Sequence, residues 1–316
     1  MRILVIVVSY NFERWMDRCL GNLRLSEFPA DVLVIDNASQ DRTVRLIKER
    51  YPEARLIESK ENLGFGRANN IGMKIAIEEG YEAVFLLNQD AWIDKNTLGT
   101  LARLCREHPS YGILSPTHLT GSGDKLEHGF ASYAGLKSLE ELRGKTLAES
   151  KEGSIGQPLL PISFVNAAFW FIPTDVLRQT GGFCPLFYHY GEDVDYINRL
   201  HFHGYRIGYS PAVFGCHDRE HREVTRPAWF RSERVYLLAE YANINYPFCK
   251  AFGYGVLAGI KKAGKALLQG KAQDCLSYLR ITFHLVGRTR EVMDYRRKNL
   301  YGKGAAIYLT DSFKQA

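Results

Sequence analysis

Polar side chains end several of the apolar, β-branched runs in the first part of the sequence. The residues at these ends are Ser9, Tyr10 and Asn11, then Asp36 and Asn37, then Asn88, Gln89 and Asp90. If the runs are parallel strands, their carboxyl ends meet at one edge of a sheet, where ligands bind in such folds. An aspartate there can accept a hydrogen bond from a ribose or base, or bind a metal. Asp36 or Asp90 taken alone is equally well explained as a turn residue.

A second group of chemically useful side chains lies between Tyr188 and Asp195. Glu192, Asp193 and Asp195 enter a predicted helix directly after an aromatic segment. The helix dipole alone favours acids in a first turn. Crowded carboxylates beneath aromatic rings can also give one of them a pKa suited to a general base. We therefore expect one base here, with the other acids structural.

Two further segments could contact a ligand. The stretch 62–70, which contains Gly66 and Arg67, predicts a glycine turn opening a helix, where backbone N–H groups can hold a phosphate. It follows the third apolar run and not the first, which argues against an NAD-binding domain. His217 ends a strand-like run and could provide a nitrogen ligand beside Asp90. A zinc site among the neighbouring histidines and Cys216 lacks recognisable ligand spacing.

The elements that would position these residues alternate in type along the chain. The expected strands are 3–8, 31–35, 54–58 and 83–87, with helices near 12–25, 41–50 and 67–79. This alternation predicts an α/β fold with a mostly parallel sheet flanked by helices. The Gly-, Ser-, Lys- and Glu-rich stretch 120–158 predicts a long mobile excursion near a site, and the apolar run 162–172 resumes the core.

Five short motifs, in order, resemble an inverting family 2 glycosyltransferase with the Rossmann-like GT-A fold, particularly bacterial rhamnosyltransferase-like members. The motifs are Val5–Asn11, Leu33–Ser39, Asn62–Asn70, Leu86–Asp90, and Gly181–Phe183 followed by Tyr190–Asp195. The resemblance covers about residues 3–217. The basic remainder of the chain is much less diagnostic.

The resemblance implies a binding site for a nucleotide-diphosphate sugar, with dTDP or UDP as the nucleotide. By it, the donor contacts are Ser9, Tyr10, Asn11, Asp36, Gly66, Arg67, Asn88 and Asp90. Asp36 would read the base or ribose, and a loop around Gly66 and Arg67 would close over the nucleotide. Asp90 would be the last residue of the family's D-x-D element and would hold Mg²⁺ or Mn²⁺ with His217. Asn88 replaces the first acid of that element, which removes a negative charge from the metal site.

The resemblance also implies a reaction by single displacement. Asp193 matches the second acid of the family's E-D pair and would take the proton from an acceptor hydroxyl, so the sugar's configuration inverts. A covalent sugar–enzyme intermediate, and hence a second carboxylate nucleophile, is unnecessary. Asn166, Tyr188 and Glu192 are the candidate acceptor contacts. The expected acceptor is a lipid-linked glycan in cell-surface polysaccharide synthesis.

The charge of the chain divides it in two. Of 316 residues 46% are hydrophobic and 24% charged, as in ordinary globular proteins. The net charge is +6, and residues 226–316 hold 16 Lys and Arg against 6 Asp and Glu, which is +10, so the rest is mildly acidic. We therefore expect a catalytic domain over 1–226, with a nucleotide part to about 115 and an acceptor part over about 116–226. Residues 227–316 would be basic amphipathic helices facing an anionic membrane, or packing on protein.

The lack of a recognisable targeting signal and the spacing of the cysteines predict a reducing compartment. The six cysteines form no C-x-x-C pair, the N-terminal apolar run lacks a cleavage site, and no run approaches the length of a membrane span. The expected location is the cytoplasm, at the inner face of the membrane. Two alternatives remain open: a sugar-phosphate nucleotidyltransferase, and a non-catalytic nucleotide- or glycan-binding protein. No nucleic-acid motif is present, and the oligomeric state is left open.

Overall fold

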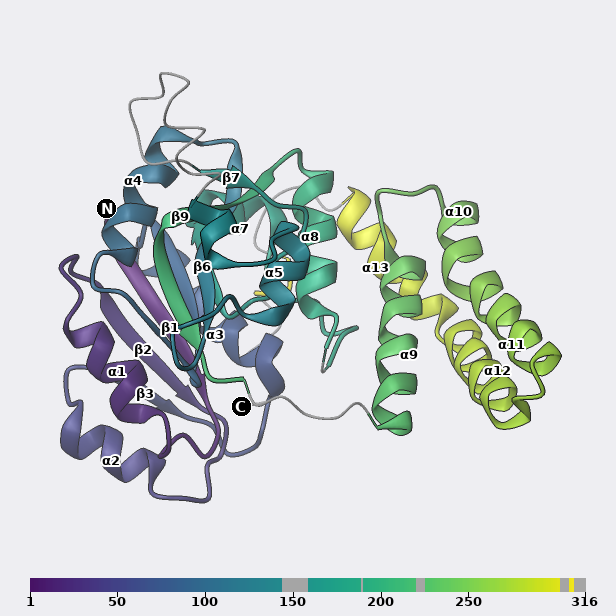
Figure 1. The fold of residues 1–316 in the computed structure, drawn as a ribbon, viewed down its shortest axis with the longest axis horizontal. Coiled ribbons are helices and arrows are strands. Elements are labelled where there is room, and N and C mark those ends of the chain that lie inside the picture. The colour runs from purple at the N-terminus through teal and green to yellow at the C-terminus, as the bar shows by residue number, and fades with distance from the viewer. Residues whose placement is uncertain (144–158, 189, 220–224, 302–306, 310–316) are drawn as a thin grey trace.

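The computed structural model describes residues 1–143, 159–188, 190–219, 225–301 and 307–309 (Figure 1). The strands are β1 (Ile3–Ser9), β2 (Asp31–Asp36), β3 (Arg55–Glu58), β4 (Ala83–Asn88), β5 (Ala91–Ile93), β6 (Tyr111–Thr120), β7 (Leu160–Pro161), β8 (Phe169–Pro173) and β9 (Arg206–His217). The helices of the sheet part are α1 (Met16–Arg24), α2 (Thr43–Arg50), α3 (Gly64–Glu78), α4 (Thr97–Glu107), α5 (His128–Ala134), α7 (Thr174–Thr180) and α8 (Glu192–Phe202). The later helices are α9 (Arg226–Ala242), α10 (Phe248–Phe252), α11 (Ala258–Leu268), α12 (Ala272–Gly287) and α13 (Thr289–Tyr301), with a π-helical stretch η1 (Gly253–Leu257) before α11.

The strands of the described residues form one mixed sheet. Its order is β3-β2-β1-β4-β8-β6-β9-β5, and β7 pairs with β9. The first four strands in this order are parallel to one another, and β8 joins them antiparallel to β4. Helices cross over between the parallel strands, as the alternation in the sequence predicts. The expected α/β class is confirmed.

Alternate residues of β1 explain how helices come to cover both faces of the sheet. Leu4 and Ile6 join a cluster with side chains of α3, α7 and α8, whereas Ile3, Val5 and Val7 join one with α1, α2 and α4. All five are at most 3% exposed. A strand buried on both faces is a near-continuous apolar run, which is what residues 3–8 are.

The later helices lie beside the sheet part and form a third apolar cluster. Figure 1 shows α9 to α12 on one side of the molecule and α13, in yellow, running back toward the sheet. Leu237, Leu285 and Val292 are buried in this cluster, and Phe187 from the sheet part joins it. Residues 307–309 return to the main body, where Leu309 is buried in the α3 cluster. Among the described residues, no helix is both long and apolar enough to cross a membrane.

Part of the expected excursion over 120–158 is ordered, so that prediction is wrong for its first half. β6 continues to Thr120, and α5 begins at His128, after the N-cap residue Glu127, whose carboxylate accepts a hydrogen bond from the backbone N–H of Phe130 at 2.8 Å. Phe130 is fully buried and anchors the short helix. Residues 144–158 lie outside the described residues.

Candidate active site

The carboxyl ends of β1, β2 and β4 meet, as their sequence predicts. Ser9 is in register with Asp36, and Val8 with Asn88. Ser9 Oγ donates a 3.0 Å hydrogen bond to Asp36 Oδ1, and both side chains are at most 2% exposed. The polar residues at the strand ends therefore lie side by side at one edge.

Asp36 organises the loop after β2. Its carboxylate accepts hydrogen bonds from the N–H of Ser39 at 2.9 Å and from the Ser39 hydroxyl as well as from Ser9. At 2% exposure it is nearly closed to a ligand. The turn role considered for Asp36 is thus present in the structure. Its contact with a base or ribose stays a prediction.

Tyr10 and Asn11 form the outer part of this edge. The backbone N–H of Tyr10 donates to Gln89 Oε1 at 2.7 Å, and Gln89 Nε2 donates back to the Tyr10 carbonyl at 3.1 Å. Asn11 has a positive φ of 52° and accepts from the N–H of Gln40 at 2.9 Å. The Tyr10 ring is 44% exposed, so it is free to face a ligand. Gln89 was not predicted as a donor contact, although it stands between Asn88 and Asp90, which were.

The glycine segment differs from the expected loop. Helix α3 begins at Gly64, three residues before the expected start, so Gly66 and Arg67 belong to its first turn. Gly66 is buried against Phe183. A Cβ at this position would lie 3.0 Å from Phe183 Cβ, so the absence of a side chain lets α3 pack closely there. The loop expected around Gly66 and Arg67 is therefore wrong as local structure. Arg67 is exposed on the helix, and the donor-contact roles of both residues stay predictions.

Asp90 and His217 lie together, as the metal hypothesis requires. His217 Nε2 is 3.3 Å from Asp90 Oδ1, and the N–H of Asp218 donates to the Asp90 carbonyl at 2.8 Å. The His217 side chain is 5% exposed and the Asp90 side chain 26%. His217 Nδ1 is buried without a hydrogen-bond partner. One oxygen ligand and one nitrogen ligand are therefore prearranged, while among the described residues no group of three metal-ligating side chains occurs.

The acids at the start of α8 have separate environments. Burial raises the pKa of Asp193, against the opposing charge of Arg219, and Asp193 Oδ1 accepts from the Val194 N–H at 2.8 Å. Burial, and then the charge of Asp193, raise the pKa of Glu192 to about 7. One carboxyl oxygen of Glu192, Oε2, is buried without a partner. Both groups have the raised proton affinity that general acid–base work needs.

Asp195, by contrast, is fully used in holding the fold together. It accepts from Arg199 Nε at 2.9 Å and from the Tyr295 hydroxyl. Arg199 is fully buried and also donates to the carbonyls of Thr180 and Gly182, the latter at 2.7 Å. This network joins α8 to the Gly181–Gly182 turn and to α13. A structural role for this third acid agrees with the expectation that only one of the three is a base.

The candidate acceptor residues lie on several elements. Asn166 is half-buried, and its Oδ1 accepts from the Ala168 N–H at 3.3 Å next to the Asn88 backbone. Tyr188 is 59% exposed, and its hydroxyl donates to the Asn62 carbonyl at 3.3 Å. Tyr133 of α5 was missed: its ring packs against Phe164 at 4.7 Å between centroids. Burial and then the Asp193 charge raise the pKa of Tyr133, so its phenol lies close enough to that carboxylate to feel its field.

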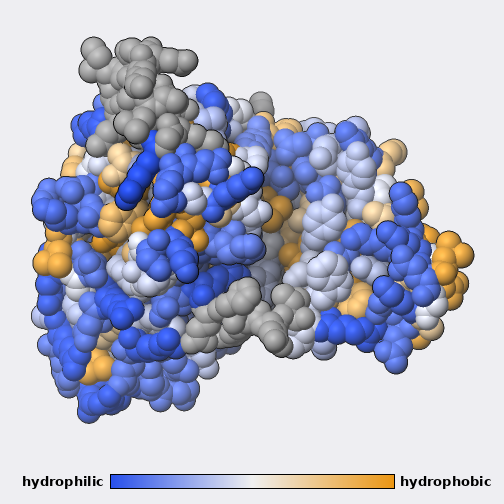
Figure 2. Space-filling view, in the orientation of Figure 1, coloured by the Kyte–Doolittle hydropathy of each residue, from blue (hydrophilic) through white to orange (hydrophobic). Residues whose placement is uncertain are grey.

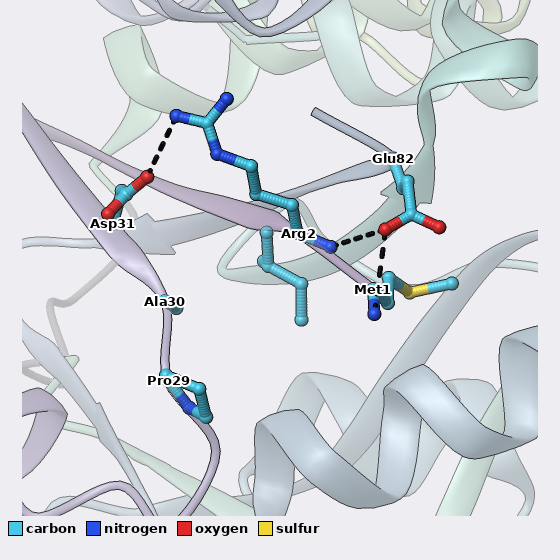
Figure 3. A pocket seen from close by; sticks show the side chains of 7 residues that line it. Met1, Arg2, Pro29, Ala30, Asp31 and Glu82 are labelled. Atoms are coloured by element: carbon cyan, nitrogen blue, oxygen red, sulfur yellow. Dashed lines mark hydrogen bonds and ion pairs between the residues drawn. The ribbon is translucent and has the colours of Figure 1, made fainter. Parts of the chain in front are cut away.

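The strand edge, the acids of α8 and the end of β9 belong to one region. His217 contacts Asp90, and Arg219, two residues further on, acts electrostatically on Asp193. A hollow of about 510 Å³ lies elsewhere, at the amino ends of β1 and β2. Figure 3 shows it lined by Arg2, whose guanidinium donates to Asp31 and whose backbone N–H donates to Glu82. That hollow is away from the edge at which the chemically useful residues gather.

Comparisons with known proteins identify the family of the chain. A model of the family described as Glycosyltransferase (GlcNAc) matches residues 94–294, and one of Glycosyl transferase family 2 matches residues 4–151. The N-acetylglucosaminyl-diphospho-decaprenol L-rhamnosyltransferase of Mycobacterium tuberculosis is 24% identical over 247 residues, which cover 71% of this chain and 78% of that protein. The poly(ribitol-phosphate) beta-N-acetylglucosaminyltransferase TarS of Staphylococcus aureus is 32% identical over 120 residues, 36% of this chain and 20% of TarS.

Solved structures resemble the whole chain. S. aureus TarS 1–349 in complex with UDP-GlcNAc has a TM-score of 0.58 at 15% identity, covering 99% of this chain and 89% of that one. The mannosyltransferase PcManGT from Pyrobaculum calidifontis, in complex with GDP-Man and Mn²⁺, has a TM-score of 0.51 at 20% identity, covering 95% and 87%. These likenesses confirm the expected GT-A fold.

Proposed function

Because the chain belongs to the family 2 glycosyltransferases, we propose that it moves a sugar from a nucleotide-diphosphate sugar to a hydroxyl of a lipid-linked glycan, inverting the anomeric configuration. The observation that carries this proposal is the convergence of two features. A strand edge with the Asp90–His217 pair lies in the same region as Asp193, a partly buried carboxylate of raised pKa. Family membership argues against the nucleotidyltransferase and non-catalytic alternatives.

In the proposed reaction Asp193 accepts the proton. The acceptor hydroxyl attacks the anomeric carbon from the face opposite the nucleotide, and its proton passes to the Asp193 carboxylate as the new bond forms. Burial raises the pKa of Asp193, which makes its ionised form a stronger base than that of an exposed aspartate. The bond from the anomeric carbon to the diphosphate oxygen breaks in the same step. Tyr10 and Asn11 would position the nucleotide.

A divalent cation fits the residues at the strand edge. The Asp90 carboxylate and the His217 imidazole are the two side chains that would hold it, and the pyrophosphate would supply further oxygen ligands. When bound, the cation supplies positive charge against that of the leaving diphosphate. The His217 side chain is 5% exposed and contacts the Asp90 carboxylate, which is 26% exposed, so the imidazole is positioned before the donor arrives. The relation to PcManGT, which was solved with GDP-Man and Mn²⁺, supports this assignment.

The relatives support the choice of substrates. The M. tuberculosis relative is named for rhamnosyl transfer to a diphospho-decaprenol sugar, and TarS was solved with UDP-GlcNAc. We therefore propose a UDP- or dTDP-sugar donor and an acceptor carried on a polyprenyl diphosphate. Such acceptors are membrane lipids, so the proposed place of action is the cytoplasmic face of the membrane.

A donor screen tests the proposed function. Binding of UDP-, dTDP- and GDP-sugars is measured by calorimetry with Mn²⁺ and with a chelator, for the wild type and for Asp90→Ala. We expect one nucleotide class to bind tightly in Mn²⁺ and about tenfold or more weaker in chelator and in Asp90→Ala, because both changes leave diphosphate charge uncompensated. NMR of the product should show an inverted anomeric centre. Equal donor affinity under all three conditions would overturn the metal assignment, and retained configuration would overturn the displacement.

A further inference from the structure

The hairpin formed by α11 and α12 leaves large apolar side chains in solvent. Leu267 is 61% exposed and Leu268 91% at the end of α11, and Phe283 of α12 is 74% exposed. Leu257 at the end of η1, Ile260 of α11 and Leu276 of α12 are each at least half exposed. Figure 2 shows apolar surface at the end of the molecule where α11 and α12 lie in Figure 1.

These side chains are not the ones that hold the hairpin to the protein. The inner contact uses Gly259, where a Cβ would lie 2.4 Å from Thr282 Oγ1, together with buried Ile281 and Leu285. From the end of η1 along α11, the exposed apolar residues Leu257, Ile260 and Leu267 recur at helical spacing away from that contact. The packing of the hairpin is therefore complete without them.

Cations surround the exposed apolar residues. Lys261, Lys265, Lys271 and Arg280 are exposed, and within the described residues no ion pair involves any of them. The two other charged residues of the hairpin form ion pairs within the protein. Lys262 pairs with Glu233 of α9, and Asp274, the single acid over residues 251–287, pairs with Arg226 at 2.6 Å.

We propose that the α11–α12 hairpin binds the surface of an anionic phospholipid bilayer, with Leu267 and Leu268 entering the interface and the four cations facing lipid headgroups. An apolar face bordered by lysines is the pattern of helices that lie in a membrane interface. Charge decides against a second copy of the chain as the occupant. A two-fold contact between hairpins would bring eight unpaired cations together without counter-charges, whereas an anionic leaflet neutralises them.

The binding of purified full-length protein to vesicles tests this inference. Co-sedimentation is measured with phosphatidylcholine vesicles containing phosphatidylglycerol, and with phosphatidylcholine alone. We expect binding to the anionic vesicles and at least about tenfold weaker binding to the neutral ones. Leu267→Gln with Leu268→Gln should weaken the binding at least about tenfold. Lys261→Gln, Lys265→Gln and Lys271→Gln together should weaken it about a hundredfold, since each lost charge removes roughly a fivefold contribution.

Matched variants separate the hairpin from general surface properties. Leu25→Gln removes an exposed leucine (69% exposed) of the sheet part. Arg45→Gln, Lys48→Gln and Arg103→Gln remove three exposed charges from α2 and α4. Both controls should bind like the wild type, and circular dichroism should show all variants folded. Unchanged vesicle binding in the two hairpin variants overturns the proposal, as does a hairpin-dependent dimer in light scattering with no vesicle binding, which would give the surface to a second copy.

Membrane binding by the hairpin would bring the enzyme to a membrane-borne acceptor. The inference rests on the proposed function in this respect only. The vesicle assay uses neither donor nor acceptor, so it can fail while transfer succeeds. Hydrolysis of a soluble donor by the hairpin variants should equal that of the wild type. A wild-type protein that binds the vesicles but hydrolyses no donor would instead count against the proposed function.

Discussion

Glu192 and Asp193 are adjacent carboxyls, and burial raises the pKa of both. Glu192 has a pKa of about 7, because it is buried and lies beside the charge of Asp193. In its protonated form Glu192 can donate a hydrogen bond to an acceptor. Raised pKa values of this kind are common among the acids and bases of catalytic sites.

Replacing Glu192 with Gln should stabilise the protein in a pH-dependent way. A carboxyl whose pKa is higher in the folded than in the unfolded protein destabilises the folded state as pH rises. The loss of stability begins near the unfolded-state pKa and continues up to the folded-state pKa. From the ordinary 4.5 to about 7, this loss amounts to about 3 kcal/mol. Glu192→Gln should match the wild type near pH 4.5 and exceed it by up to about that amount at pH 8, measured by urea unfolding.

An exposed glutamate provides the control for that measurement. Glu61→Gln removes a carboxyl at the surface and should leave the free energy of unfolding unchanged at every pH. If Glu192→Gln shows the same small effect as Glu61→Gln at pH 8, then Glu192 is not a buried group with a raised pKa.

The sequence predicts most of the residues that gather at the strand edge, but not how each is used. The pairing of Asp90 with His217 follows from strand ends and residue types. The structural role of Gly66 against Phe183 does not, because it depends on α3 meeting the segment between α7 and α8, more than a hundred residues later. Tyr133 was missed for a related reason: α5 is seven residues long and depends on burying Phe130, which periodicity in so short a segment cannot show.

At the scale of elements, α8 carries both the candidate base and the network that fixes its position. Asp195 and Arg199 lie one turn apart and connect the helix to Gly182 and, through Tyr295, to α13. Asp193 is two residues before Asp195 on the same helix. The network thus positions the helix that presents Asp193.

Asp195→Asn should destabilise the fold where Asp193→Asn does not. Removing one partner of a buried ion pair leaves the other charge uncompensated, which costs about 3–5 kcal/mol. Tyr295→Phe loses a single hydrogen bond to the same carboxylate and should cost about 1.5–3 kcal/mol. The free energy of unfolding in urea measures both changes.

Asp175→Asn is the matched control, since Asp175 pairs with Arg178 but its side chain is 87% exposed. We expect its effect to stay within about 0.5 kcal/mol. A loss as small as this for Asp195→Asn would show that the buried network does not hold α8.

The predicted bounds of the strands are close to the observed bounds where the sequence follows a single hydrophobic pattern. The strands expected at 3–8 and 83–87 are Ile3–Ser9 and Ala83–Asn88. The start of α3 was placed too late because Asn62 and Asn37 begin the helix through side-chain hydrogen bonds to the N–H groups of Gly64 and Leu63. Asn37 belongs to a different loop, so the local sequence pattern around α3 does not reveal its contact.

At the scale of the whole molecule, the charge division in the sequence corresponds to a helical part beside the sheet part. The return of residues 307–309 was not foreseen, because contacts between distant segments leave no local pattern. Ile307 accepts a hydrogen bond from the Gly182 N–H at 2.8 Å, and Leu309 is buried in the main core. The division of the chain at residue 226 stays a prediction. Deleting 227–316 would remove part of the core, so substitutions in the hairpin test membrane binding more cleanly.

The central claim is that Asp193 is the base of an inverting glycosyl transfer, and Asp193→Asn tests it most directly. The initial rate of transfer and the donor dissociation constant are measured side by side for this variant and the wild type. We predict a rate lower by about a hundredfold to ten-thousandfold, a donor affinity within about twofold, and a free energy of unfolding no lower than that of the wild type, because the lost proton acceptor is a carboxyl of raised pKa that does not stabilise the fold. Transfer at nearly the wild-type rate would contradict the account.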